Sequence, residues 1–213
     1  MKTDHYKEKS IHYGIGHTRL RRILALAQNI SGKRILDVGC ATGYVGAELK
    51  KLGAYVVGTD ISDKAVEIAK KQLDEAHTVE AGDILPRDFS GPYFDLILCA
   101  EVIEHVFEPV ELLRLINANL NSDGVVIITT PNFMTWTNRL KFLFGKFHYT
   151  AQGMFDFGHI RFFTYEYLQE VLLASGFRII EEQNIIFPGK LTWLLKYWPS
   201  LFAFQFIIKA EKI

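Results

Sequence analysis

Arg34-Ile-Leu-Asp-Val-Gly-Cys-Ala-Thr-Gly43 is the most informative stretch of this chain, because a short apolar run with one acid leads into a turn with two glycines. The apolar run predicts a buried strand, and the turn predicts that the C-terminal end of this strand meets a ligand. Glycine suits such a turn because it adopts positive φ readily and because its missing Cβ lets backbone N–H groups approach a bound molecule.

Two classes of ligand use a glycine turn after the first strand of an α/β sheet. A dinucleotide requires G-x-G-x-x-G at the start of a helix, whereas the glycines here stand at 39, 43 and 46. Asp37 points the same way, because a carboxylate at the strand end suits a ligand with an ammonium group and repels a pyrophosphate. The turn therefore disfavours a nicotinamide-dependent dehydrogenase.

The rest of the chain alternates strand and helix patterns. After the strand that begins at Arg34, strands are expected at 55–60, 77–81, 94–100, 124–130, 177–187 and 204–212. Helices are expected at 18–28, 44–52, 63–73, 109–120 and 165–175. This alternation predicts one α/β domain over residues 1–213, with a doubly wound, mostly parallel, seven-stranded sheet.

Three motifs carry a resemblance to a known family. The glycine turn resembles motif I of the class I S-adenosylmethionine-dependent methyltransferases, with Ala41 in place of the middle glycine. Glu101-Val-Ile-Glu-His105, and Gly158 to Leu168 with the following Ala174-Ser-Gly-Phe177, are similar to the methyltransferases grouped with the ubiquinone-biosynthesis O-methyltransferases and the methionine-biosynthesis W protein. The resemblance implies a Rossmann-like fold, S-adenosylmethionine as cofactor and S-adenosylhomocysteine as product.

Acids at the strand ends are candidate cofactor ligands. Asp60 follows Gly39 by 21 residues, near the roughly 20 expected when an acid at the second strand end meets a ribose. Asp83 matches the position that the resemblance assigns to the adenine amino group, with an ordinary turn acid as the alternative. The predicted cofactor-binding residues are Asp37, Gly39, Cys40, Gly43, Asp60, Ile61, Gly82, Asp83, Ile84 and Ala100.

The transfer of a methyl group from a sulfonium is a single in-line displacement, so the protein must align the reactants and needs no nucleophile of its own. A hydroxyl acceptor benefits from a general base, and imidazole titrates near neutral pH. His105 is the first candidate and His159 the second, with a loop-holding hydrogen bond as the alternative role of each. Asn132 is a candidate substrate contact.

Glu101, Glu104, His105 and His159 together are similar to the magnesium site of some ubiquinone-pathway and small-RNA terminal 2′-O-methyltransferases. Carboxylate oxygens there would hold Mg²⁺ and polarise an acceptor hydroxyl. The alternative is that Glu104 interacts with the arginines of the helix at 18–28. The metal ligands therefore stay unassigned, and Mg²⁺ is the less favoured option.

Residues 131–163 separate the fifth strand from the next helix, although such connections usually take roughly 2 to 6 residues. They hold ten aromatic residues, and 187–206 hold seven more of the chain's 28, so we expect a lid and an aromatic C-terminal cover that pack together. Such a surface suits a phenol, a quinol or a lipid-linked acceptor. Membrane contact through Trp193, Tyr197 and Trp198, or a homodimer interface, are further options.

Composition excludes several classes. The 24 basic and 24 acidic residues balance to a net charge of 0, which offers no electrostatic case for nucleic acid. The two cysteines favour neither a disulfide framework nor a cysteine zinc site, and they fit a reducing cytoplasm. Residues 1–9 are polar and lack a signal peptide's apolar core. The uncharged run at 197–208 has 12 residues, against the roughly 20 of a spanning helix.

These observations predict a cytoplasmic S-adenosylmethionine-dependent methyltransferase that acts on an oxygen of a small, partly apolar acceptor. The alternative is a non-catalytic S-adenosylmethionine-binding regulatory or assembly protein, which would keep the glycine turn and lack a productive site. His105 and the lid favour the enzyme.

Overall fold

The computed structural model describes residues 16–86, 93–151, 153–186 and 197–213. Within them lies one mixed sheet of the order β3-β2-β1-β4-β5-β8-β6, with β7 paired to β8. The strands are β1 (Arg34–Val38), β2 (Tyr55–Asp60), β3 (Glu75–Thr78), β4 (Phe94–Ala100), β5 (Leu120–Pro131), β6 (Phe177–Glu182), β7 (Ile185–Ile186) and β8 (Ala203–Lys212). Strands β1 to β5 pair in parallel, and β8 runs antiparallel to β5, β6 and β7. The predicted doubly wound, mostly parallel sheet is confirmed.

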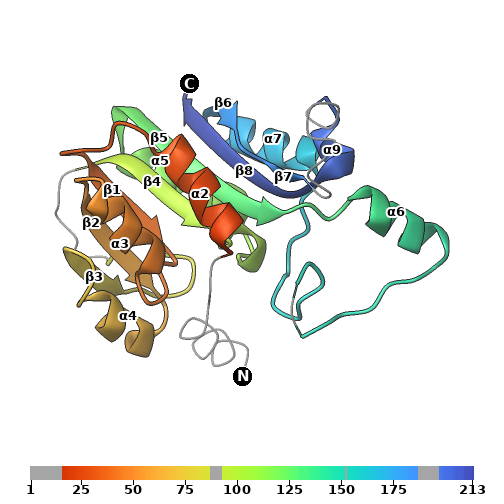
Figure 1. Cartoon of the computed structure of the whole chain (residues 1–213), viewed down its shortest axis with the longest axis horizontal. Coiled ribbons are helices and arrows are strands. Elements are labelled where there is room, and N and C mark those ends of the chain that lie inside the picture. Colours follow the sequence, from red (N-terminus) through yellow and green to blue (C-terminus); the bar gives the residue numbers. More distant parts are fainter. Residues whose placement is uncertain (1–15, 87–92, 152, 187–196) are drawn as a thin grey trace.

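Helices cover both faces of this sheet (Figure 1). The helices are α2 (His17–Leu26), α3 (Tyr44–Lys51), α4 (Asp63–Ala69), α5 (Pro109–Asn119), α6 (Trp136–Leu143), α7 (Tyr165–Ala174) and α9 (Pro199–Phe202), with a 3-10 turn, η1 (Ile103–His105), after β4. Buried residues of α2, α3 and α4 belong to one hydrophobic core, and those of α5 and α7 belong to a second.

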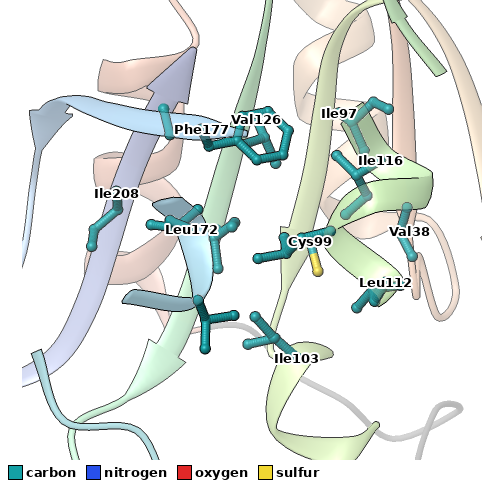
Figure 2. Close-up of a cluster of buried hydrophobic side chains, with 14 of the residues drawn as sticks. Val38, Ile97, Cys99, Ile103, Leu112, Ile116, Val126, Leu172, Phe177 and Ile208 are labelled. Carbon is teal, nitrogen blue, oxygen red and sulfur yellow. The ribbon is translucent and has the colours of Figure 1, made fainter. Parts of the chain in front are cut away.

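Strand β4 separates the two cores. Leu96 and Leu98 join the core of α2, α3 and α4, while Ile97 and Cys99 join the core of α5 and α7. Figure 2 shows Ile97 and Cys99 among side chains of the second core. Because successive strand residues point to opposite faces and both faces are covered, this strand is apolar along its length.

Several element boundaries differ from the prediction. The strand expected at 77–81 lies at Glu75–Thr78, where it pairs with Val57–Asp60 of β2. The single strand expected at 177–187 is divided into β6 and β7. The division falls at Asn184, whose side-chain Oδ1 accepts the N–H of Ile207 in β8 at 2.9 Å. The described sheet therefore has eight strands, since one predicted strand is interrupted.

The strand order predicts where a ligand site lies. The chain winds outward in opposite directions from β1 and β4, which are neighbours at the middle of the sheet. Open α/β sheets bind ligands at such a reversal, outside the C-terminal ends of the strands. The glycine turn follows β1 at this edge, and Glu101 follows β4.

The segment between β5 and α7 runs away from the sheet, forms α6 at the edge of the molecule and returns (Figure 1). Its return is fixed by backbone hydrogen bonds, since the N–H groups of Ile160 and Arg161 each donate to the carbonyl of Glu104 at 3.0 Å. Residues 187–196 of the predicted C-terminal cover, with Trp193, lie outside the described residues, as do the polar residues 1–9.

Among the described residues, no helix combines the length and the apolar character that crossing a membrane requires.

Candidate active site

The turn after β1 is built from left-handed backbone. The φ angles are 68° at Gly39, 49° at Ala41 and 85° at Gly43. A Cβ on Gly39 would lie 2.5 Å from a methyl carbon of Val102, so no larger residue fits there without displacement. Ala41, where the resemblance leads us to expect glycine, adopts the same region at a cost of roughly 1 to 2 kcal/mol. The turn thus has the form that the glycine spacing predicts.

A pocket opens beside this turn, between the ends of β1 and β4. Its lining residues are Asp37, Gly39, Cys40, Ala41, Thr42, Tyr44, Val45 and Ala100. Asp37, Gly39, Cys40 and Ala100 are predicted cofactor residues, so the structure brings four of that set to one hollow, and Gly43 begins α3 beside them.

Asp37 is the most unusual residue of this pocket. It is buried, and its Oδ2 atom has no hydrogen-bond partner within the described part of the chain. Burial raises the pKa of Asp37 to about 7; the backbone amide of Gly46 opposes this effect and the charge of Asp60 adds to it. An unsatisfied buried carboxylate is costly, and the ammonium group of S-adenosylmethionine is a donor that would satisfy it. Asp37 therefore fits the predicted cofactor.

Asp60 ties the glycine turn to the second strand. It is buried at the end of β2, and its two carboxylate oxygens accept the backbone N–H groups of Ala41 and Ser62, each at 2.9 Å. A carboxylate oxygen has two lone pairs, so both oxygens keep acceptor capacity for a ribose.

The remaining predicted cofactor residues lie along the neighbouring loops. Ile61 and Asp83 are half-buried, Gly82 is exposed and Ile84 is buried. The loop of residues 82–84 is held to β2 because Thr59 Oγ1 donates to the carbonyl of Ile84 at 2.9 Å. These four residues do not line the pocket described above, so their part in cofactor binding stays a prediction.

A second polar cluster lies beyond the end of β4. Glu104, His105 and His159 each offer a ligand atom, and these atoms lie within 4.8 Å of one another. The two imidazole rings meet edge to face, with centroids 4.8 Å apart. His159 reaches this position because the backbone after it is bonded to Glu104 and because Asp156 Oδ1 accepts the N–H of Gly158 at 2.8 Å. The structure thus brings together both predicted catalytic histidines.

Backbone carbonyls determine the proton positions on both rings. His105 Nδ1 lies 3.0 Å from the carbonyl oxygen of Gly158, and His159 Nδ1 lies 2.9 Å from that of Met154. A carbonyl oxygen only accepts, so each Nδ1 carries a proton. In the neutral ring, Nε2 is then the unprotonated nitrogen and can accept a proton or bind a metal. The loop-holding role and a chemical role are therefore compatible, since they use different nitrogens.

Glu104 is the third member of the cluster. It is buried, its Oε2 accepts from Thr130 Oγ1 at 3.2 Å, and its Oε1 has no hydrogen-bond partner among the described residues. Burial raises the pKa of Glu104 well above its ordinary value, and the negative charge of Glu101 raises it further. Two imidazole nitrogens and one carboxylate oxygen can hold a divalent cation, and this donor set suits transition metals better than Mg²⁺, which prefers oxygen ligands.

Glu101 does not join the three potential ligands, in contrast to the predicted four-residue set. Its Oε2 lies 2.9 Å from Arg19 Nη1 of α2, and its Oε1 accepts from Thr129 Oγ1 at 2.8 Å and from Gln205 Nε2. Arg19 forms its ion pair with Glu101. Its positive charge also acts on Glu104, whose pKa it lowers, so the expected interaction of Glu104 with the arginines of the first helix is electrostatic. The left-handed backbone of Glu101, with φ of 57°, turns the chain between the two glutamates.

Asn132 has a structural role. Its Nδ2 donates to the carbonyls of Ser200 and Ala203, and its Oδ1 accepts the N–H of Met134. The side-chain amide of Asn132 is fully buried, and both its nitrogen and its oxygen are engaged in these hydrogen bonds. The predicted contact of Asn132 with the substrate is therefore not supported.

Three contacts of the site were not predicted from the sequence. Arg19 neutralises Glu101, Thr130 donates to Glu104, and Asp156 shapes the turn before His159. Only Asp156 has a local signal, since an Asp two residues before a glycine is typical of an Asx turn.

Comparison with known proteins identifies the family. Residues 11–182 match the methyltransferase-domain family, so the chain belongs to that family. The ubiquinone biosynthesis O-methyltransferase of Actinobacillus pleuropneumoniae serotype 7 (strain AP76) is 33% identical over 132 residues, which cover 58% of this chain and 56% of that protein. The protein of the same name from Bradyrhizobium diazoefficiens is 29% identical over 178 residues, which cover 78% and 67%. The chain spans about half the length of the first of these relatives.

Solved structures share the fold. Magnesium protoporphyrin IX methyltransferase from Synechocystis PCC 6803, with bound SAH, superposes with a TM-score of 0.67 at 18% identity and covers 97% of this chain and 93% of that chain. An S-adenosylmethionine-dependent methyltransferase from Mesorhizobium loti gives a TM-score of 0.66 at 18% identity, with coverage of 92% and 99%. The family match confirms the predicted membership of a methyltransferase family, and the superposed structures confirm the Rossmann-like fold.

Proposed function

We propose that this protein transfers the methyl group of S-adenosylmethionine to an oxygen atom of a small, partly apolar acceptor, such as a phenol, a quinol or a lipid-linked intermediate. The observation that carries the proposal is the closeness of two sites along one sheet edge. The pocket with the unsatisfied Asp37 follows β1, and the cluster of Glu104, His105 and His159 follows β4, the neighbouring strand.

The cofactor supplies an electrophilic methyl group when it is bound. The chain's part is to hold that group in line with the acceptor, and well-oriented geometry alone is worth roughly 7 to 11 kcal/mol of the barrier. In the proposal, Asp37 accepts from the ammonium group and the backbone around Gly39 and Gly43 lies against the methionine end. Asp60 accepts from the ribose while it continues to hold the Ala41 amide.

His105 is the proposed general base. As the acceptor oxygen forms its bond to the methyl carbon and the sulfur–carbon bond breaks, the hydroxyl proton passes to Nε2 of His105. Nδ1 stays bonded to the carbonyl of Gly158, which keeps the ring in place. The proton leaves the acceptor, so the product is a neutral ether, and His159 lies close enough to take the same role.

A divalent cation held by Glu104, His105 and His159 would serve the same end by polarising the acceptor hydroxyl. One carboxylate oxygen of Glu104 and one imidazole nitrogen of each histidine lie within 4.8 Å of one another, and such a set suits an ion in number and in chemistry.

The acceptor class is proposed from two observations. The relatives at about 30% identity carry the name ubiquinone biosynthesis O-methyltransferase. The segment between β5 and α7, which contains His159, holds aromatic rings that pack on one another. The ring centroids of Phe133 and Phe162 lie 4.6 Å apart, and those of Phe155 and Phe147 lie 5.1 Å apart. Such rings suit a flat or apolar molecule better than a charged one.

The test measures methyl transfer from labelled S-adenosylmethionine to a panel of phenols, quinols and isoprenoid-linked phenols, with mass spectrometry to locate the methyl group. His105→Asn is the informative variant, because the Asn amide can still donate to the carbonyl of Gly158 while Nε2 is lost. We expect a fall in turnover of about 10²- to 10⁴-fold with near-normal cofactor affinity. His77→Asn in β3 is the matched control and should leave turnover unchanged.

Full activity of His105→Asn would assign His105 to loop holding alone. Repeating the assay after chelation, and then with Mg²⁺, Mn²⁺ or Zn²⁺, separates a base from a metal, because only a metal centre loses activity on chelation. Tight binding of S-adenosylmethionine without product from any acceptor would favour the non-catalytic binding protein.

A further inference from the structure

Helix α6 presents apolar residues to the outside of the molecule. Of its eight residues, all within the described ranges, only Asn138 is buried. Trp136, Leu140 and Leu143 are 42%, 47% and 76% exposed, and Phe144 directly after the helix is 73% exposed. At about 100° per residue these four side chains share one face. A surface helix in a globular domain normally directs this face to the core.

Basic residues border that face. At the same helical rotation, Arg139 and Lys141 fall on its two sides, and Lys146 follows two residues after Phe144. All three are exposed. Residues 132–155 contain no Asp or Glu, although the whole chain is balanced at a net charge of 0. The α6 surface, defined as Trp136, Leu140, Leu143, Phe144, Arg139, Lys141 and Lys146, is therefore both apolar and cationic.

The opposite side of α6 is anchored. Asn138 Nδ2 donates to the carbonyl of Phe133 at 2.9 Å. At the border of the apolar face, Arg139 Nε donates to the carbonyl of Met134 at 2.8 Å. The ring of Phe142 packs against that of Phe133 with centroids 5.2 Å apart. The apolar face cannot turn inward without the loss of these contacts. Figure 1 shows α6 apart from the sheet, so the face is directed to the surroundings.

We propose that the α6 surface docks on an anionic lipid bilayer. Trp and Leu side chains on one helix face enter the boundary between headgroups and acyl chains, and the flanking cations contact the lipid phosphates. Exposed aromatic residues of the same segment, Tyr149 and Phe157, extend the apolar area. The helix is too short to span the bilayer, and it would lie along its surface.

Charge argues for lipid over a second copy of the chain. A two-fold dimer through this face would bring like surfaces together and place Arg139, Lys141 and Lys146 close to the same residues of the partner. Repulsion between like charges opposes that contact, whereas an anionic bilayer satisfies all three. The inference goes beyond the proposed function and is tested without turnover, so either can fail while the other stands.

The experiment is co-sedimentation of the full chain with vesicles of phosphatidylcholine alone or with about 30% phosphatidylglycerol. We expect binding to the anionic vesicles at low salt and a marked loss at high salt, because exposed charges are then screened. Leu143→Ser should lower the partition coefficient at least about ten-fold. Lys141→Gln should lower it about five-fold.

Matched controls lie elsewhere on the surface. Leu173→Ser in α7 removes a leucine that is 65% exposed, and Lys51→Gln in α3 removes an exposed lysine; neither should change vesicle binding. The proposal is overturned if the wild-type chain does not bind anionic vesicles, or if Leu143→Ser and Leu173→Ser bind equally. It is also overturned if sedimentation velocity shows a dimer that Leu143→Ser dissociates, because the face would then be covered by a second copy.

Discussion

The β1–β4 sheet edge and helix α6 depart from ordinary burial in opposite directions. The sheet edge buries Asp37, Asp60 and Glu104, whereas α6 exposes Trp136, Leu140 and Leu143. The two departures differ in their cost. A buried acid loses hydration on folding, so it lowers the stability of the folded state. An exposed apolar side chain is in contact with water in both the folded and the unfolded states, so its exposure costs the fold little.

Because of this difference, substitutions in the two regions should change different measurable quantities. Substitutions at the sheet edge should change the free energy of unfolding together with ligand binding. Substitutions on the outer face of α6 should change association with a partner and leave the free energy of unfolding unchanged. Each prediction below tests one side of this comparison, and the largest expected effect comes first.

Asp37→Asn should raise the free energy of unfolding at pH 8 by roughly 1 to 4 kcal/mol, since each pKa unit corresponds to about 1.4 kcal/mol. The pKa of Asp37 in the folded protein, about 7, lies above its ordinary value of 3.8. The penalty is therefore complete above pH 7, shrinks as the pH falls and is absent below pH 4. Urea unfolding at pH 4, 6 and 8 measures this, and the same substitution should weaken binding of S-adenosylmethionine. Equal stability of the two proteins at pH 8 would show that Asp37 is not destabilised by burial.

Asp60→Ala should lower the free energy of unfolding by about 1 to 3 kcal/mol, because the amides of Ala41 and Ser62 lose their acceptor. It should also weaken cofactor binding by at least about 1 kcal/mol through the loss of charge-assisted hydrogen bonds to the ribose. Chemical unfolding and titration calorimetry measure the two effects separately. Lower stability with unchanged affinity would leave Asp60 with the structural role alone.

Asn138→Ala and Leu140→Ser form a matched pair within α6. Asn138 is buried and donates to the carbonyl of Phe133, so its loss should cost about 1 to 2 kcal/mol of stability. Leu140 is exposed, so its substitution should change stability by no more than about 0.5 kcal/mol. Thermal unfolding of both variants provides the comparison. A larger loss for Leu140→Ser would mean that the outer face is packed against the protein.

Ala41→Gly should produce a small gain in the free energy of unfolding, of about 0.5 kcal/mol. Relief of the left-handed backbone at Ala41 favours glycine by roughly 1 to 2 kcal/mol, and the greater freedom of glycine in the unfolded chain offsets roughly 0.4 to 1 kcal/mol. Unfolding by urea should resolve the difference if the two proteins are measured in parallel. A loss of stability would indicate that the Ala41 methyl makes a packing contact worth more than the strain.

Much of the sheet edge could be predicted because its signals are local. The glycines at 39 and 43 require positive φ, and the apolar runs of β1 and β4 require burial on both faces, so short windows of sequence indicate both. The division of the strand at 177–187 was not predicted. It depends on a side-chain bond from Asn184 to β8, which lies more than twenty residues later in the chain.

The segment between β5 and α7 shows even more clearly that local sequence does not predict contacts between distant residues. Its ten aromatic residues predicted a lid, and many of these rings do pack on one another. The pattern did not reveal that α6 turns Trp136, Leu140 and Leu143 outward. Helical periodicity identifies a common face, but the anchoring of the opposite side by Asn138 and Phe142 determines which way that face points.

The local order of residues was sufficient for the class of fold, the position of the cofactor turn and the candidate acids and histidines, because strand burial and turn geometry depend on neighbouring residues. The partners of those groups depend on contacts between distant segments. Arg19 forms an ion pair with Glu101, which stands 82 residues later in the chain. His159 lies beside His105 because of the backbone bonds to Glu104 and the turn at Asp156. Whether a given acid is neutralised, hydrogen-bonded or left unsatisfied is therefore a property of packing, and that property gives Asp37 and Glu104 their raised pKa values.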